Sequence, residues 1–143
     1  MPTLKAGCFL IDTKTKKLAV VYRQKFKQYS FPKGHLEGEE SLLECAIRET
    51  EEETKRKPKV LPEFEPIVEA YTTPAGELCE CYMYFAIDDG PSDNKSTDSH
   101  DTFWFYTNEI DDLICYSDGL LNTYRQAKPI IQKILNKNWS WFF

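Results

Sequence analysis

The sequence predicts an α+β fold in which helices pack on a single mixed β-sheet. Short segments alternate apolar and polar residues with the period of two that half-buried strands require, and two longer segments repeat apolar residues with the helical period. In chain order these segments are two strands, a helix, three strands and a final helix. The chain has 143 residues, 41% of them hydrophobic, which is enough to bury one core, so we expect one domain over residues 1–143.

Five segments have the composition of strands, and turns rich in Gly, Pro, Asp and Ser separate them. The expected strands are residues 6–11, 18–23, 66–73, 78–87 and 102–106. The first two form a hairpin across a polar turn, and the third and fourth flank the turn sequence PAGE. In the fourth, apolar residues alternate with polar residues and tyrosines, so one of its faces is expected to be buried.

The central helix is expected to begin at Ser41. The Ser41 hydroxyl caps the first turn while the Glu44 carboxylate reaches back to the Ser41 backbone, which is the arrangement called a capping box. Pro58 is expected to end the helix. The side that faces the sheet is formed by Leu43, Ala46, Ile47, Thr50 and Thr54.

The rest of the chain divides into connections and a final helical region. Residues 25–30 are expected to form a polar connection, and residues 88–99 a surface loop, because both are dominated by polar and turn-forming residues. A helical turn is expected at residues 108–113 and a last helix at residues 119–137, where apolar residues recur at helical spacing. Pro129 lies inside this last helix and is expected to kink or split it.

Composition and charge exclude several classes of protein. The net charge of −5 and the isoelectric point near 5.1 argue against binding of nucleic acid through overall charge. No apolar run approaches the roughly 18 residues that span a bilayer, and the N-terminus lacks a basic leader followed by an apolar stretch. The five cysteines are odd in number and lack zinc-ligand spacing, which is typical of reduced thiols. We therefore expect a cytoplasmic protein without a membrane partner.

Eight glutamates lie within residues 37–53, and Arg48 is the one basic residue among them. Glu49, Glu52 and Glu53 stand at positions i, i+3 and i+4, so their carboxylates converge on one side of the predicted helix and repel each other. A bound divalent cation reverses this repulsion, because Mg²⁺ and Mn²⁺ prefer oxygen ligands. A solvated acidic face without a ligand is the alternative, and the helix alone leaves both open.

The turn that precedes the helix favours the metal hypothesis. Its sequence PKGH places Lys33 and His35 on either side of Gly34, where both side chains are candidate phosphate contacts. A cation site, phosphate contacts and a tight turn close together are more typical of a pyrophosphate-binding site than of an ordinary acidic surface.

Arg48 shares a third stripe of the helix with Glu44 and Glu51. At this spacing the guanidinium is expected to pair with both acids. The segment ends with the basic residues Lys55, Arg56 and Lys57. Their positive charges interact favourably with the negative, C-terminal end of the helix dipole.

This segment resembles the Nudix box. The signature of that family is Gly, five residues, Glu, seven residues, Arg-Glu, an aliphatic residue, any residue, Glu-Glu, any residue, Gly and an aliphatic residue. Every charged member is present at the right spacing over residues 34–56. The matching residues are Gly34, Glu40, Arg48, Glu49, Glu52 and Glu53.

The segment also departs from the signature. Thr50 replaces an aliphatic residue, and its methyl group can still face the core. Lys55 and Arg56 replace the usual Gly and aliphatic residue. Lys55 therefore either adopts the left-handed conformation, at a cost of about 1 kcal/mol, or lets the helix continue toward Pro58.

The resemblance implies an α/β/α sandwich and hydrolysis, dependent on Mg²⁺ or Mn²⁺, of a nucleoside diphosphate linked to another group. It implies that Glu52 and Glu53 are the principal metal ligands and that Glu49 is a further ligand or the general base. Arg48 would orient a glutamate through an ion pair, and the backbone of Gly34 would join the metal shell. The implied catalytic set is Glu49, Glu52 and Arg48.

The sequence FPKGHLE…RETEEE is similar to the diadenosine tetraphosphate hydrolase branch of the family. This resemblance implies a dinucleoside polyphosphate substrate that is cleaved to ATP and AMP. It also implies that Lys33 and His35 line the phosphate path, that Tyr84 contacts phosphate and that Tyr116 stacks on adenine. For the two tyrosines, ordinary packing is the alternative.

The general base and the substrate class stay open at this point. Asp98, His100 and Asp101 are further candidates for the base, because in this family it sometimes lies in a later loop. One alternative function is removal of 5′ pyrophosphate or a cap from RNA, which predicts a large basic surface where this chain has only short basic clusters. The other is a non-catalytic nucleotide-binding module, which Lys55 and Arg56 keep open.

Overall fold

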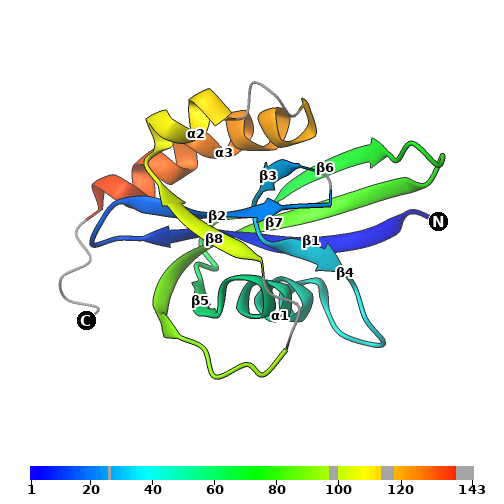
Figure 1. Cartoon of the computed structure of the whole chain (residues 1–143), viewed down its shortest axis with the longest axis horizontal. Helices are drawn as coiled ribbons and strands as arrows, with labels where there is room; N and C mark the ends of the chain where they lie inside the picture. The colour runs from blue at the N-terminus through cyan, green and yellow to red at the C-terminus, as the bar shows by residue number, and fades with distance from the viewer. Residues whose placement is uncertain (26, 97–99, 114–117, 138–143) are drawn as a thin grey trace.

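The computed structural model describes residues 1–25, 27–96, 100–113 and 118–137 (Figure 1). The elements are β1 (Thr3–Asp12), β2 (Lys17–Arg23), β3 (Gln28–Ser30), β4 (Lys33–His35), α1 (Leu42–Thr54), β5 (Arg56–Val60), β6 (Ile67–Thr72), β7 (Leu78–Pro91), β8 (Asp101–Phe105), α2 (Thr107–Leu113) and α3 (Asp118–Asn136). No helix among these residues is long and apolar enough to cross a membrane.

Within the described residues, all eight strands belong to one mixed sheet. The two longest strands form its centre, where β1 and β7 run parallel from the pair Thr3–Cys79 to the pair Ile11–Ile87. The other pairings are antiparallel: β2 and β4 pair with β1, β3 and β8 pair with β2, and β5 and β6 pair with β7. The sheet order through the centre is β3-β2-β1-β7-β5.

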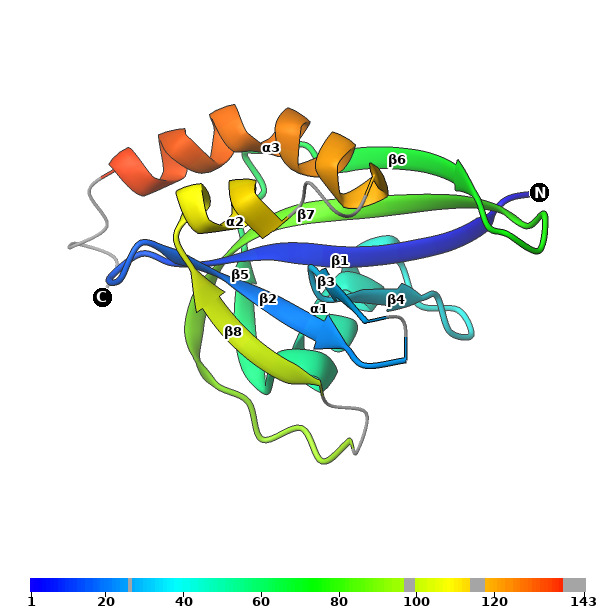
Figure 2. The ribbon, with the colours of Figure 1, turned by 45° about the horizontal axis from the view of Figure 1, so that its top comes forward.

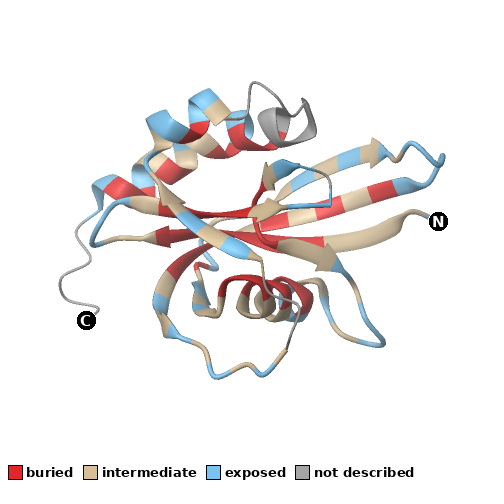
Figure 3. Ribbon diagram, in the orientation of Figure 1, coloured by how far each residue is buried: buried red, intermediate tan, exposed pale blue. Residues whose placement is uncertain are grey.

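The sheet lies between two helical layers, which confirms the expected α/β/α sandwich. Helix α1 covers one face, and α2 and α3 cover the other (Figures 1 and 2). Each face of the sheet has its own apolar core, as the buried segments in Figure 3 indicate. The core beneath α3 is large and aromatic and includes Phe9, Phe31, Phe85 and Tyr124. The core beneath α1 is built of small residues and includes Ala6, Cys8, Cys45 and Ala46, so α1 packs close to the sheet.

The alternating sequence patterns predicted the long strands and the helices to within a few residues. The expected hairpin at the start of the chain is confirmed, and the Asp12 carboxylate closes its turn by accepting the backbone N–H groups of Lys14 and Thr15. Helix α3 continues through Pro129 and is not split. The short strands β3, β4 and β5 were not predicted, because each is only three to five residues long and carries few apolar side chains.

Helix α1 begins as predicted and ends earlier than predicted. Ser41 is its N-cap, and the reciprocal bonds between Ser41 and Glu44 form the expected capping box. The helix ends at Thr54 because Lys55 adopts the left-handed conformation, with φ 60° and ψ 27°. The expectation that the helix runs to Pro58 was therefore wrong, since Pro58 lies in β5.

Ala46, Thr50 and Thr54 are buried as predicted, but the face of α1 that packs on the sheet is rotated toward Cys45. Leu43, predicted to face the sheet, is 41% exposed, whereas Cys45 is fully buried. The buried side of the helix also includes Glu49 and Glu53. A pattern of apolar residues cannot reveal this rotation, because it counts glutamates as solvent-facing.

We expect Ser41→Ala to lower the free energy of unfolding by about 1 kcal/mol, because the backbone N–H of Glu44 loses the Ser41 hydroxyl as its acceptor. Urea denaturation measures this change, with Glu39→Ala at a neighbouring exposed position as the control. Equal stabilities of the two variants would contradict the assigned role of the cap.

Candidate active site

The glycine of the PKGH turn lies directly against a glutamate of α1. Gly34 stands opposite Ala6 in the pairing of β4 with β1, and the carboxylate of Glu49 packs onto its Cα. A Cβ added at Gly34 would lie 2.2 Å from the Cδ of Glu49, so no larger residue fits without a shift of the carboxylate. Lack of space, and not a left-handed backbone, is what requires glycine here.

Arg48 links the turn to the helix through several charged bonds. One guanidinium nitrogen donates to Glu49 at 2.9 Å and to Glu52 at 3.1 Å. The other side of the guanidinium holds both oxygens of Glu40, at 3.0 and 2.7 Å, and the carbonyl of His35 at 2.9 Å. One cation therefore holds three carboxylates of the signature together.

These partners differ from those predicted. The expected pairs of Arg48 with Glu44 and Glu51 are not formed, because both acids have other partners. Glu44 accepts the backbone N–H of Ser41, and Glu51 accepts the hydroxyl of Ser92. Helical spacing placed Arg48 near these acids, and the folded turn brings Glu40 closer still.

The pKa values of this cluster follow from its geometry. The Arg48 guanidinium lowers the pKa of the Glu40 carboxyl to about 2, and the bond to Glu40 raises the pKa of Arg48 in return. Burial raises the pKa of Glu52, against the opposing effect of Arg48. Glu40 is therefore the fixed anion that locks Arg48 in place.

Glu53 is the most deeply buried of the three converging acids. It is 2% exposed, and Arg23 of β2 donates to its carboxylate at 3.1 Å. Burial raises its pKa to about 8, the Arg23 charge opposes that rise, and the neighbouring Glu49 adds to it. The buried carboxylates of Glu49 and Glu53 thus each have an arginine partner, Arg48 for Glu49 and Arg23 for Glu53.

The donor chemistry of this space fits a hard divalent cation. Both carboxylate oxygens of Glu49 lie next to the backbone of Gly34, and only the missing Cβ of glycine leaves that approach open. In the described part of the chain, no three acidic, histidine or cysteine side chains are already gathered as a metal site. Instead, one nitrogen of Arg48 bonds the carboxylates of both Glu49 and Glu52.

Strand β4 places the predicted phosphate contacts on its other face. Lys33 pairs with Gly7 and lines a small cavity together with residues of the core beneath α3, whereas Gly34 faces α1. The ammonium groups of Lys5 and Lys33 lie 5.4 and 5.6 Å from the centre of the Tyr71 ring. His35 stands opposite Lys5 in the same pairing and is exposed. Two lysine ammonium groups thus lie at one tyrosine ring.

The structure does not bring Tyr84 to this group. Tyr84 packs against the core beneath α1, where burial raises the pKa of its hydroxyl, and so lies on the opposite face of the sheet from Lys33. Tyr71 was not among the predicted residues. The expected pairing of the strands now seen as β6 and β7 could have indicated it, because the register places Tyr71 opposite Cys79, on the face of the sheet that Tyr84 does not share. Tyr116 lies outside the described residues, as does Asp98.

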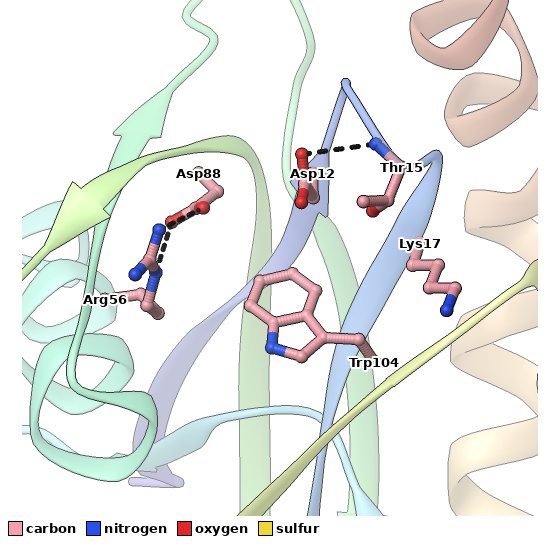
Figure 4. Close-up of a pocket in the computed structure, with 6 residues that line it drawn as sticks. All are labelled: Asp12, Thr15, Lys17, Arg56, Asp88 and Trp104. Carbon is pink, nitrogen blue, oxygen red and sulfur yellow. Dashed lines mark hydrogen bonds and ion pairs between the residues drawn. The ribbon is translucent and has the colours of Figure 1, made fainter.

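The other candidate residues are placed around the end of α1. The backbone N–H of His100 donates to the carbonyl of Glu53 at 3.4 Å, and Asp101 begins β8. Trp104 lines a cavity of about 290 Å³ in which Arg56 and Asp88 form a two-bond ion pair (Figure 4). None of the converging glutamates lines this cavity.

Comparisons with known proteins agree with this architecture. The sequence profile of the NUDIX domain family matches residues 1–126. No curated protein matches the sequence.

Solved structures of several hydrolases share the fold. A NUDIX hydrolase from Nitrosomonas europaea aligns with a TM-score of 0.70 and 18% identity, over 90% of this chain and 91% of its own. The Ap4A (diadenosine tetraphosphate) hydrolase of C. elegans aligns with a TM-score of 0.68 and 19% identity, over 88% of this chain and 98% of its own. A bifunctional NMN adenylyltransferase/ADP ribose pyrophosphatase from Francisella tularensis, complexed with AMP and a manganese ion, aligns with a TM-score of 0.62 and 17% identity. The alignment covers 93% of this chain and 42% of that enzyme.

The contact between Gly34 and Glu49 can be tested by a double-mutant cycle. We expect Gly34→Ala to lower the free energy of unfolding by about 1–3 kcal/mol, because the new methyl group overlaps the carboxylate. We expect the double variant Gly34→Ala/Glu49→Ala to be more stable than the sum of the single changes predicts, because the shortened side chain makes room. Additive changes in urea denaturation would show that the two residues do not interact.

Proposed function

Because this chain belongs to the Nudix family, a family of pyrophosphate-bond hydrolases, we propose that it is a Mg²⁺-dependent enzyme that cleaves a nucleoside polyphosphate. The substrate we propose is diadenosine tetraphosphate, and the products are ATP and AMP. The proposed enzyme uses residues 1–143 as one domain. We place it in the cytoplasm, because the thiols of Cys8, Cys45, Cys79 and Cys81 are free and buried.

One observation carries this proposal. Glu49, Glu52 and Glu40 converge on Arg48 next to the bare backbone of Gly34, with buried Glu53 beside them. A surface under selection for stability alone would separate these acids. Their concentration at a glycine that space requires suits a site for a cation and the phosphates bound to it.

The comparisons support the proposed substrate class and cofactor without fixing either. The structure of C. elegans Ap4A hydrolase shares the fold over most of both chains, and the Francisella enzyme was solved with AMP and a manganese ion. Both share fewer than one residue in five with this chain, so they support the fold, and the proposed substrate is argued from the residues of the site.

Each residue has a defined task in the proposed mechanism. Glu52 and Glu53 would hold the cation together with the Gly34 backbone, and the cation would supply water activation and charge neutralisation at the phosphoryl oxygens. Glu49 would complete the ligand set or serve as the general base. Arg48 keeps the carboxylates of Glu49 and Glu52 at a fixed separation.

In this proposal the cation contacts the phosphates that are cleaved, and the nucleoside and the phosphates farther from the cation are bound on the other face of β4. Lys33 and Lys5 bring two positive charges to the Tyr71 ring, and His35 extends the group toward solvent. Ammonium groups bind phosphate oxygens as point charges, and a tyrosine ring offers a stacking surface for a base. The short strand therefore carries a glutamate contact on one side and a phosphate contact on the other.

The purified protein should first be assayed against diadenosine tetraphosphate, ADP-ribose, dNTPs, inositol pyrophosphates and 5′-triphosphorylated RNA, with and without Mg²⁺. We expect ATP and AMP from diadenosine tetraphosphate, and only when the metal is present. Preferred turnover of the RNA would assign the decapping-type function instead. No turnover of any substrate would leave a nucleotide-binding module.

Glu52→Gln is expected to lower kcat by about 100-fold, because the amide supplies no negative charge to a cation. Glu44→Gln is the matched control on the same helix, since Gln also completes a capping box. Steady-state rates on the preferred substrate measure both variants. A loss of equal size in the two variants would assign the effect to the helix and not to the site.

Lys33→Met is expected to raise KM about tenfold with little change in kcat, because it removes a charge that binds the ground state and the transition state alike. Lys57→Met, an exposed position on β5, is the control for loss of one positive charge. Unchanged KM in the Lys33 variant would remove this lysine from the substrate site.

A further inference from the structure

The end of α1 makes close contacts with residues 92–96, which follow β7. The Lys55 ammonium donates to the carbonyl of Ser96, and the Lys55 carbonyl accepts the backbone N–H of Ser92 at 2.9 Å. One turn earlier, the Glu51 carboxylate accepts the hydroxyl of Ser92 at 2.7 Å. Two residues of the helix therefore hold both ends of this five-residue segment.

The held segment is braced by its own hydrogen bonds. The hydroxyl of Ser92 accepts the backbone N–H of Asn94 at 3.1 Å, and the side-chain carbonyl of Asn94 accepts the backbone N–H of Ser96 at 2.8 Å. Side chains that bond to the backbone two residues away stabilise turns of this kind. Because these bonds fix the conformation of the segment, holding Ser96 in place also restricts the position of Ser92.

The same end of the helix is closed by residues that precede and begin β8. The carbonyl of Glu53 accepts the backbone N–H of His100 and the hydroxyl of Thr102, both at 3.4 Å. The last carbonyls of a helix have no partner within the helix, so such donors fix where its final turn ends. That turn carries the carboxylates of Glu52 and Glu53.

Lys55 occupies a strained position that glycine would occupy more easily. Its φ of 60° lies in the left-handed region that disfavours residues with a Cβ, and the Nudix signature has glycine here. Glycine has no side chain that could reach Ser96. In this chain the strain accompanies a contact that a family-typical glycine cannot make.

Arg56 adds a second tie at the base of the same loop. Its guanidinium donates two bonds to Asp88, at 2.9 and 2.7 Å, where β7 pairs with β5 (Figure 4). Lys55 and Arg56, two of the three residues that depart from the Nudix signature, thus both bond to the chain that follows the centre of β7.

We propose that Lys55 and Glu51 are positioning residues. They anchor residues 92–96 to the end of α1 and so set the position of the helical turn that presents Glu52 and Glu53. This inference rests on the proposed function, in which those two glutamates act on the cation. Lys55 and Glu51 themselves touch neither substrate nor cation.

Lys55→Gly separates positioning from stability, because the substitution relieves backbone strain while it removes the anchor. We expect the thermal midpoint to stay unchanged or to rise, whereas kcat falls about tenfold and KM changes little. We also expect faster amide hydrogen exchange at Ser92 and His100, measured residue by residue by NMR. Lys55→Arg keeps a donor of similar reach and should restore both kcat and the exchange rates.

Lys16→Gly is the matched control. Lys16 also has a positive φ, of 65°, and its ammonium also donates to a backbone carbonyl, that of Leu135, far from α1. The control therefore makes the same backbone change and loses the same type of bond. We expect its kcat and the exchange rates at Ser92 and His100 to match those of the wild type.

Unchanged exchange at Ser92 and His100 in Lys55→Gly would overturn the proposal, whatever the activity. A fall in kcat that Lys16→Gly shares, or that Lys55→Arg does not reverse, would also overturn it. If the wild type turns over no substrate, the proposed function fails by itself. Normal exchange in Lys55→Gly would then reject the anchor, and faster exchange would support it.

Discussion

The Arg48 guanidinium is the interaction on which the arrangement of the site depends. It reaches forward along α1 to Glu49 and Glu52 and back to Glu40 and the His35 carbonyl in the preceding turn. Without it, several carboxylates would repel each other at the place where the helix meets β4. One residue thus sets both the distance between acids and the path of the turn.

The sheet supports this cluster on the α1 side and carries a second group of side chains on the opposite side of β4. Small residues beneath α1 let the helix approach the sheet closely enough for Glu49 to rest on Gly34. Because side chains alternate along β4, Lys33, which directly precedes Gly34, lies on the face of the sheet opposite α1, beside Tyr71. A strand of three residues therefore connects the acidic cluster on one side with a basic and aromatic group on the other.

The sequence was sufficient for the parts that depend on local patterns. Alternation and helical spacing predicted β1, β2, β6, β7 and β8, and the capping box predicted the start of α1. The spacing of the Nudix signature also predicted which charged residues share a region. Local spacing did not give what depends on the tertiary path: the partners of Arg48, and the placement of Tyr84 and Lys33 on opposite faces of the sheet, follow from how strands and turns meet.

Two outcomes lay beyond local patterns for physical reasons. Leu43 is exposed and Glu53 is buried, because α1 packs on the sheet with Cys45 and with Glu49, which contacts Gly34, and a count of apolar residues does not include such contacts. The short, polar strands β3, β4 and β5 exist because longer strands offer them partners, a contribution that no single-segment pattern contains.

The parallel pairing at the centre of the sheet has a consequence for how the chain folds. Strand β1 comes from the first residues of the chain, and its parallel partner β7 comes from beyond the middle. A contact between such distant segments closes a long loop and raises the contact order, which slows folding. During synthesis β1 therefore cannot complete its parallel pairing until residues 78–91 have emerged, so the centre of the sheet forms late, whereas β4, which contacts Glu49, precedes α1 and can pair with β1 earlier.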